Sequence, residues 1–264
     1  MDLSPLRFDV SSVTHAGKVR ERNEDSYLVR TDIGLWAVAD GMGGHEAGDL
    51  ASRILVESLD AIEQPEAALD LLEQCETQIF GANQQIMDLS RVRGATIGTT
   101  AAVLLVRDKH YACVWAGDSR VYLVSGGAIK QVSRDHTEVE ELVAAGTLSR
   151  EDAENWPNNV ITRAIGAAED LELEVVTGAA DPGDIFVICS DGLTKHLADG
   201  EILRFAAGRN ARAACEAMLE LALERGGFDN VTIVVVRLLS AVARSSEPTK
   251  SSVTGGPECG GHES

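Results

Sequence analysis

Positive charge is scarce in this sequence. Its 264 residues include 23 Lys and Arg against 42 Asp and Glu, so the formal net charge is −19 at pH 7. Binding to nucleic acid or to an anionic membrane surface depends on basic patches. The composition therefore argues against both kinds of partner. The acidic excess becomes informative where carboxylates converge on a cation.

Long apolar runs and paired cysteines are missing as well. The longest charge-free, apolar-rich run, residues 94–106, is too short to span a bilayer as a helix. The N-terminus has no basic start followed by an apolar stretch, so no secretory signal is visible. Five scattered cysteines form no CxxC pair, which is typical of a reducing cytosol. We therefore expect a cytoplasmic protein with no membrane insertion.

Hydrophobic periodicity predicts groups of strands that alternate with pairs of helices. Strands are expected at residues 7–15, 25–31, 34–40, 96–108, 110–117, 119–127, 128–133, 172–178, 184–190 and 230–239. Helices are expected at 47–62, 65–89 (opened by Pro65), 138–145, 149–155, 201–208 and 211–226. This order indicates a sandwich of antiparallel sheets with helices packed outside it. Residues 240–264, rich in Ser, Gly and Pro, are expected to form a disordered tail.

Acidic residues recur where apolar strands end. Asp40-Gly41 and Asp191-Gly192 each follow such a strand. The other candidates are Asp118, Asp229 and the pair Glu24-Asp25. A folded sheet can gather its strand ends at one rim, where several carboxylates would repel one another unless cations neutralise them. Oxygen ligands without His or Cys favour Mg²⁺ or Mn²⁺, so this pattern predicts a site for two such ions.

Two divalent ions of this kind suit the hydrolysis of phosphate esters, because they activate a water and offset transition-state charge. Arg20, just before Glu24, can clamp phosphate oxygens. Two other phosphatase chemistries are excluded. A thiol phosphatase needs Arg six residues after its Cys, where Cys113 and Cys189 have Ser119 and Lys195. An aspartyl-phosphate enzyme needs a DxD pair, which the sequence lacks.

Eight motifs in order resemble those of the metal-dependent protein phosphatases of the 2C type, and most closely the compact bacterial serine/threonine phosphatases. They are VRERNED, VADGMGGHEAGDLAS, GTT, AGDSR, DHT, NVITRAIG, CSDGL and DNVT. The resemblance covers roughly residues 8–239. It implies an α+β fold, a four-layer α-β-β-α sandwich in which two antiparallel sheets lie between pairs of helices. Residues 1–239 would be the catalytic domain and 138–162 a flap beside the active site.

The resemblance also implies residue roles. Asp40 would bridge two Mn²⁺ or Mg²⁺ ions, Asp191 and Asp229 would complete the ligands of the first, and the Gly41 carbonyl would serve the second. Asp118 would hold a weaker third ion. Glu24 and Asp25 would act through metal-bound waters, and Arg20 would bind the substrate phosphate. The implied partners are phosphorylated proteins, including a Ser/Thr kinase and its substrates, acted on by a monomeric enzyme.

Two positions depart from the family pattern. Met42 stands where some members have a histidine proposed to protonate the leaving group, which leaves His45 as the candidate general acid. Lys195 stands where some members have another acid, so we expect it to weaken the third ion. A catalytically silent, phosphoprotein-binding regulator of the same fold stays open as the alternative, although every core metal-binding position is intact.

Overall fold

The computed structural model describes residues 6–43, 47–153, 156 and 160–240. The strands in those residues are β1 (Arg7–His15), β2 (Asp25–Arg30), β3 (Leu35–Met42), β4 (Gly98–Thr99), β5 (Ala101–Arg107), β6 (His110–Ala116), β7 (Arg120–Ser125), β8 (Ala128–Gln131), β9 (Glu174–Ala179), β10 (Ile185–Cys189) and β11 (Val231–Leu239). The helices are α1 (Ala47–Asp60), α2 (Ala68–Arg93), α3 (Glu138–Ala144), α4 (Arg150–Ala153), α5 (Asp191–Thr194), α6 (Asp199–Ala207) and α7 (Ala211–Glu224).

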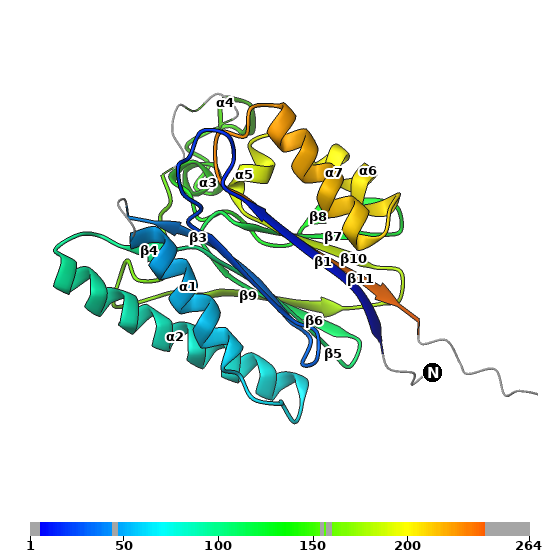
Figure 1. Cartoon of the computed structure of the whole chain (residues 1–264), viewed down its shortest axis with the longest axis horizontal. Helices are drawn as coiled ribbons and strands as arrows, with labels where there is room; N and C mark the ends of the chain where they lie inside the picture. Colours follow the sequence, from blue (N-terminus) through cyan, green and yellow to red (C-terminus); the bar gives the residue numbers. More distant parts are fainter. Residues whose placement is uncertain (1–5, 44–46, 154–155, 157–159, 241–264) are drawn as a thin grey trace, which may run out of the picture.

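Two antiparallel sheets form the centre of the molecule. One has the strand order β1-β11-β10-β7-β8, and the other has the order β2-β3-β5-β6-β9, with β4 paired to β3. Helices α1 and α2 cover the second sheet and α6 and α7 cover the first (Figure 1). The expected four-layer α-β-β-α sandwich is therefore confirmed.

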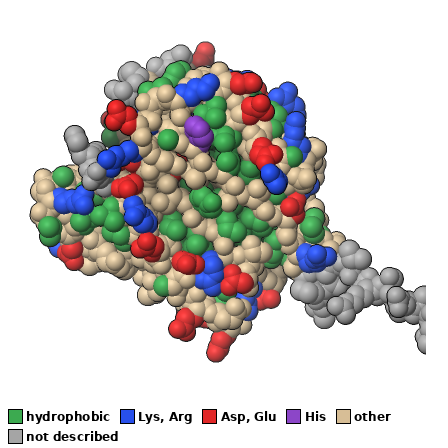
Figure 2. All heavy atoms as spheres, in the orientation of Figure 1, with side chains coloured by type: hydrophobic (Ala, Val, Ile, Leu, Met, Phe, Trp, Pro, Cys, Tyr) green, Lys and Arg blue, Asp and Glu red, His purple; other side chains and the backbone are tan. Residues whose placement is uncertain are grey.

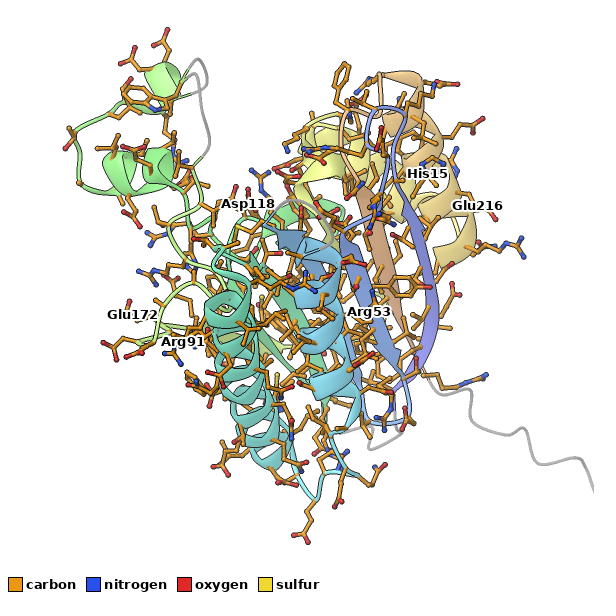
Figure 3. The ribbon with its side chains drawn as sticks, turned by 60° about the vertical axis from the view of Figure 1, so that its left-hand side comes forward. His15, Arg53, Arg91, Asp118, Glu172 and Glu216 are labelled. Atoms are coloured by element: carbon orange, nitrogen blue, oxygen red, sulfur yellow. The ribbon has the colours of Figure 1, made fainter. Side chains whose placement is uncertain are left out.

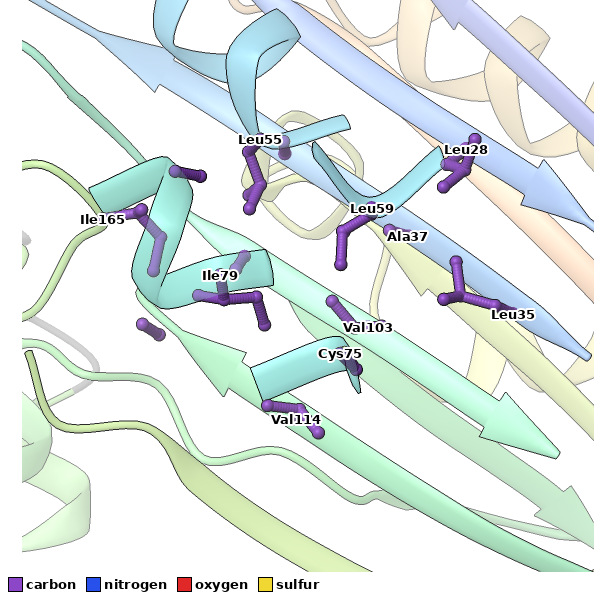
Figure 4. Close-up of a cluster of buried hydrophobic side chains, with 14 of the residues drawn as sticks. Leu28, Leu35, Ala37, Leu55, Leu59, Cys75, Ile79, Val103, Val114 and Ile165 are labelled. Carbon is purple, nitrogen blue, oxygen red and sulfur yellow. The ribbon is translucent and has the colours of Figure 1, made fainter. Parts of the chain in front are cut away.

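Each of the three interfaces between layers has its own apolar core. Between α1–α2 and the second sheet, Leu55 and Ile79 pack onto Val103 (Figure 4). Trp36 and Phe186 lie in the core between the sheets, and Met218 packs in the core beneath α6 and α7. Central strands such as β5 and β10 are buried on both faces, which explains why their sequences are apolar except for Arg107 at the end of β5.

Local signals predicted most element positions, but several boundaries differ. The second helix is Ala68–Arg93 rather than 65–89, and the third strand continues to Met42 rather than ending at Asp40. The strand expected over 96–108 is split into β4 and β5 at Thr100. The short helix α5 directly after β10 was not predicted. Gly126 and Gly127 both adopt positive φ, as the tight hairpin turn between β7 and β8 requires.

One segment stands apart from the layers. Figure 3 shows α3 and α4 projecting from the body near Asp118. The main-chain hydrogen bonds Glu138 N–Val160 O and Thr162 N–His136 O fasten the base of this segment. Part of the helix expected at 149–155 lies outside the described residues, as do Pro157, Asn158 and Asn159.

The surface carries charges of both signs. On the face drawn in Figure 2, acidic and basic side chains are interspersed with apolar ones. Within the described residues, no helix is long and apolar enough to cross a membrane. The tail at 241–264, including Cys259 and His262, lies outside the described residues.

Candidate active site

Two predicted site residues meet through strand pairing. In the antiparallel register of β2 and β3, Asp25 lies directly opposite Asp40. Side chains at paired positions project from the same face of a sheet, so the two carboxylates are neighbours. Like charges in this arrangement destabilise a sheet, which makes the pair a functional candidate rather than a structural one.

Three more carboxylates lie at the same end of the sandwich, two beside strands of the other sheet and one in a turn that joins the two sheets. Asp191 lies two residues after the end of β10, Asp229 lies two residues before β11, and Asp118 lies in the turn between β6 and β7. Ser190 joins the two sheets here, because its hydroxyl donates to Asp25 Oδ2 over 2.8 Å. The strand ends therefore gather as the sequence predicts.

Several carboxylate oxygens in this cluster are buried without a hydrogen-bond partner. They are Asp25 Oδ1, Asp118 Oδ1 and Asp191 Oδ1. Burial, together with the charges of neighbouring carboxylates, raises the pKa of Asp25 to about 7 and that of Asp118 to about 7. The pKa of Asp40 is raised well above its usual range by the same two causes. Such a cluster is electrostatically unfavourable until a cation shares it.

Asp229 differs because two cations already contact it. Arg20 binds it with Nε 2.9 Å from Oδ1 and Nη2 3.0 Å from Oδ2. Lys195 Nζ lies 2.9 Å from Asp229 Oδ2 and 2.6 Å from Asp191 Oδ2. Burial alone would raise the pKa of Asp229, but hydrogen bonds and charge from Lys195, together with the hydrogen bond from Arg20, lower it overall.

The position of Lys195 was not foreseen. The sequence predicts a positive charge that weakens a third ion at Asp118. In the structure the ammonium contacts Asp191 and Asp229, the residues expected to hold the first ion. The spacing of four residues from Asp191 could have indicated the first contact, because such residues face each other on a helix. The contact with Asp229 depends on tertiary structure.

Glycines let the strand ends approach one another. A Cβ on Gly192 would lie 1.9 Å from the carbonyl oxygen of Asn230, and one on Gly41 would lie 2.0 Å from that of Gly48. Neither position can hold a side chain without displacing backbone. The glycine after each aspartate therefore serves close backbone packing, whatever its carbonyl binds.

Two short motifs, which are too common to identify a family on their own, hold the acidic residues in place through hydrogen bonds. Thr100 of the GTT motif uses its main-chain N–H to donate to Asp40 O over 2.8 Å, and its hydroxyl accepts from Asp40 N over 2.9 Å. Asn230 of the DNVT motif accepts from Glu24 N over 2.8 Å and donates to Arg22 O over 2.8 Å. It thereby fastens the loop that carries Arg20 and Glu24.

The Asp118 turn has its own support. His136 Nδ1 accepts from Gly117 N over 3.2 Å, and His136 N donates to Gly117 O over 2.9 Å. The other ring nitrogen, Nε2, lies 3.2 Å from Glu174 Oε1. Because Nδ1 accepts, Nε2 carries the proton and faces a carboxylate. His136 belongs to the DHT motif, one of the motifs that carry the family resemblance. Its contacts to the turn that holds Asp118 were not predicted.

The two residues considered for the general-acid position, Met42 and His45, differ in what the structure shows of them. Met42 ends β3, whereas His45 lies outside the described residues. Within the described chain, no three acidic, His or Cys side chains converge closely enough to hold an ion as they stand.

The four cysteines of the described residues, Cys75, Cys113, Cys189 and Cys215, are all buried, and burial raises the pKa of each thiol. Their burial is consistent with core packing.

The donor set nevertheless fits hard divalent cations. Its members are carboxylates and main-chain carbonyls, which Mg²⁺ and Mn²⁺ prefer. The partnerless buried oxygens of Asp25, Asp118 and Asp191 are the specific observation that supports this fit.

Comparisons with known proteins agree with this chemistry. The family model described as Protein phosphatase 2C matches residues 8–231. The serine/threonine protein phosphatase PstP of Mycobacterium tuberculosis is 32% identical over 245 residues, which cover 92% of this chain and 47% of PstP. The chain thus spans about half the length of that relative.

Two solved structures are similar over most of this chain. One is PppA, described as a key regulatory component of T6SS in Pseudomonas aeruginosa, with 36% identity and a TM-score of 0.81, covering 88% of this chain and 98% of that one. The other is the catalytic domain of PstP, described as a complex with two manganese ions. It has 32% identity and a TM-score of 0.80, covering 89% of this chain and 99% of that domain.

Proposed function

The chain belongs to the protein phosphatase 2C family, and on that premise we propose that it hydrolyses phosphoserine and phosphothreonine on proteins in a metal-dependent reaction. One observation carries the proposal. Five aspartates lie within electrostatic reach of one another at one end of the sandwich, three of them with a buried oxygen that lacks a partner, and Arg20 lies beside them. Such a site has both the donors for divalent cations and a group for phosphate.

The proposed metal residues follow from this arrangement. Asp40, Asp191, Asp229 and the Gly41 carbonyl would hold two ions, and Asp118 would contribute to a weaker third. Glu24 and Asp25 would act through water. When bound, such ions supply a water-derived nucleophile near neutral pH and offset charge during in-line displacement. The manganese in the PstP structure supports Mn²⁺ as the ion, with Mg²⁺ as the other candidate.

Arg20 would bind and orient the substrate phosphate. Its guanidinium lies in a loop that Asn230 fastens through Glu24, and 55% of its side chain is exposed to solvent. A planar guanidinium can bind two phosphate oxygens at once. In this structure both of its contacts to Asp229 are made by nitrogens that could serve a phosphate. Substrate binding would then share or replace these contacts.

The proposal extends to the domain organisation and to the partners. Residues 1–239 would form the catalytic domain, 138–162 a flap that influences substrate choice, and 240–264 a tail without a catalytic role. The substrates would be phosphorylated proteins, including a bacterial Ser/Thr kinase and its targets. A phosphoproteome of a deletion strain, compared with one that carries an Asp191→Asn copy, would identify them.

The decisive test is metal-dependent turnover of a phosphothreonine peptide. EDTA should abolish phosphate release, and excess Mn²⁺ should restore it. Full activity in metal-free buffer would contradict the proposed chemistry. Asp40→Asn should abolish turnover with Mn²⁺ present, whereas Asp88→Asn on the exposed surface of α2 should leave it unchanged.

The alternative is a silent regulator that binds phosphoproteins. The description of PppA as a regulatory component is the observation that supports this alternative. The same assay distinguishes the two: a regulator would bind the phosphopeptide at saturating Mn²⁺ without releasing phosphate. The intact aspartate set favours the enzyme.

A further inference from the structure

Lys195 occupies an unusual place in the candidate active site. It is the C-cap residue of α5, one turn after Asp191, and its main-chain N–H donates to Asp191 O over 2.8 Å. Its ammonium lies 2.6 Å from Asp191 Oδ2 and 2.9 Å from Asp229 Oδ2. One cation of the chain thus joins the ends of two different strands.

The contact with Asp229 distinguishes this arrangement from an ordinary helix ion pair. A pair spaced by four residues on a helix, such as Asp191 and Lys195, is common and contributes little to stability. Asp229 lies 34 residues away, before β11. Both carboxylate side chains are only about 20% exposed, at 20% and 19%, so the ammonium neutralises charge that water screens poorly.

The same two carboxylates have a second proposed role. Asp191 and Asp229 are the residues proposed to hold the first metal ion, and Lys195 contacts the Oδ2 atom of each. Two cations cannot share these oxygens closely, because their mutual repulsion is unfavourable. An ion that binds Asp191 and Asp229 through these atoms must therefore move the ammonium away.

The side chain of Lys195 can move its ammonium away from the two carboxylates. Of its surface, 47% is exposed to solvent, and a flexible four-carbon stem connects the ammonium to the backbone. Rotation of the stem would carry the charge into water without disturbing α5. The main-chain bond to Asp191 O would persist in both positions.

We propose that Lys195 is a tethered counter-ion of Asp191 and Asp229, which the first metal ion displaces when it binds. This inference rests on the proposed metal-dependent function. In metal-free protein the ammonium holds the two carboxylates together and stabilises the folded state. Binding of the first ion is consequently an exchange of one cation for another, which lowers the apparent affinity of the protein for that ion.

The test measures two properties that need no substrate. Metal-free protein is prepared with EDTA and then exchanged into buffer without chelator. Its melting temperature is recorded, and Mn²⁺ is titrated by calorimetry. In Lys195→Met, which keeps the length of the side chain without its charge, one Mn²⁺ site should bind about tenfold more tightly. The melting temperature of the metal-free variant should fall by a few degrees, because the carboxylates lose their counter-ion.

Lys18→Met is the matched control. Lys18 lies in the neighbouring loop, where its main-chain N–H donates to Gly227 O, and its side chain is exposed. This variant removes the same charge from the same end of the molecule. Its Mn²⁺ affinity and its metal-free melting temperature should both match those of the unmodified protein. An equal gain in affinity for Lys18→Met would mean that net charge, and not displacement, is responsible, which overturns the inference.

A second variant separates displacement from ligand replacement. Lys195→Asp adds a carboxylate where some family members have one. If Lys195→Asp tightens Mn²⁺ binding while Lys195→Met does not, the position acts only as an absent ligand, and the counter-ion role is overturned. Equal affinities for Lys195→Met and the unmodified protein, with Mn²⁺-dependent turnover retained, would overturn the inference alone. Absence of Mn²⁺ binding in every variant would overturn the inference and the proposed metal dependence together.

Discussion

Asp25 of β2 lies directly opposite Asp40 of β3, so the sandwich places two carboxylates in one cross-strand pair. Ser190 donates to Oδ2 of Asp25, while Oδ1 is buried without a partner. A pair of like charges costs stability in a sheet unless something between the two carboxylates compensates it. The paired carboxylates therefore lower the stability of the metal-free fold, whereas the proposed metal binding needs them.

Asp25→Asn should stabilise the metal-free protein. The change replaces a buried carboxyl group, whose pKa is raised because burial destabilises its ionised form, with a neutral amide whose oxygen can still accept the hydrogen bond from Ser190. We expect the free energy of unfolding in EDTA to rise by about 0.2–1 kcal/mol, as measured by urea denaturation. Mn²⁺ should bind the variant more weakly in calorimetry. A less stable metal-free variant would show that the carboxylate supports the fold.

Arg20→Ala should mainly affect substrate binding. A charge-assisted hydrogen bond contributes about 1.5–3 kcal/mol, so kcat/KM for a phosphothreonine peptide should fall roughly tenfold to a few hundredfold, largely through KM. Mn²⁺ affinity should rise less than in Lys195→Met, because Arg20 contacts only Asp229 of the two proposed ligands and its side chain is 55% exposed. The control is Arg212→Ala, which breaks the exposed Arg212–Glu216 pair on α7. Unchanged kinetics for Arg20→Ala would leave Arg20 as a surface residue.

Gly192→Ala should damage the fold at the active site. Its Cβ would lie 1.9 Å from the carbonyl oxygen of Asn230, so α5 or the start of β11 must move. We expect a loss of about 1–3 kcal/mol or more in the free energy of unfolding. The control is Gly200→Ala, which meets nothing within 4 Å in α6 and should be stabilising by about 0.4–1 kcal/mol. Denaturant unfolding of both variants measures the difference.

His136 should make stability depend on pH. Burial, aided by the charge of Arg163, lowers the pKa of His136 below its ordinary value of 6.5. The unfolded chain therefore takes up a proton near pH 6.5 that the folded protein does not, so this contribution to stability is present above pH 6.5 and lost as the pH falls. In urea unfolding from pH 5 to 8, the stability of the unmodified protein relative to His136→Gln should therefore decrease as the pH falls. The exposed His110→Gln should keep the slope of the unmodified protein.

A chain that ends at Leu239 should fold and hydrolyse a small phosphate ester normally. β11 ends at Leu239, which pairs with Arg7 at the far edge of β1, and the residues beyond are too rich in Ser, Gly and Pro to build a core. Thermal unfolding and turnover of the shortened chain should match those of the full chain. A lower melting temperature would show that residues 240–264 pack against the domain.

The sequence by itself determined the elements and the identity of the acidic residues. Alternating and continuous apolar runs predicted the strands, because side-chain periodicity is a local property. Gly126-Gly127 predicted a tight hairpin turn, since two residues with positive φ favour glycine. An aspartate that closes an apolar run was visible at Asp40 and Asp191 for the same local reason. The predicted helix start at Pro65 was wrong, because a proline permits a helix start without requiring one.

Only the tertiary structure decided which of these residues face one another. The pairing of Asp25 with Asp40 depends on the register of β2 and β3, and a slip of one residue would turn one set of side chains to the other face. The contact of Lys195 with Asp229 joins residues from α5 and the start of β11, whose packing depends on Gly192 having no side chain. These contacts depend on long-range packing, which no local pattern in the sequence records.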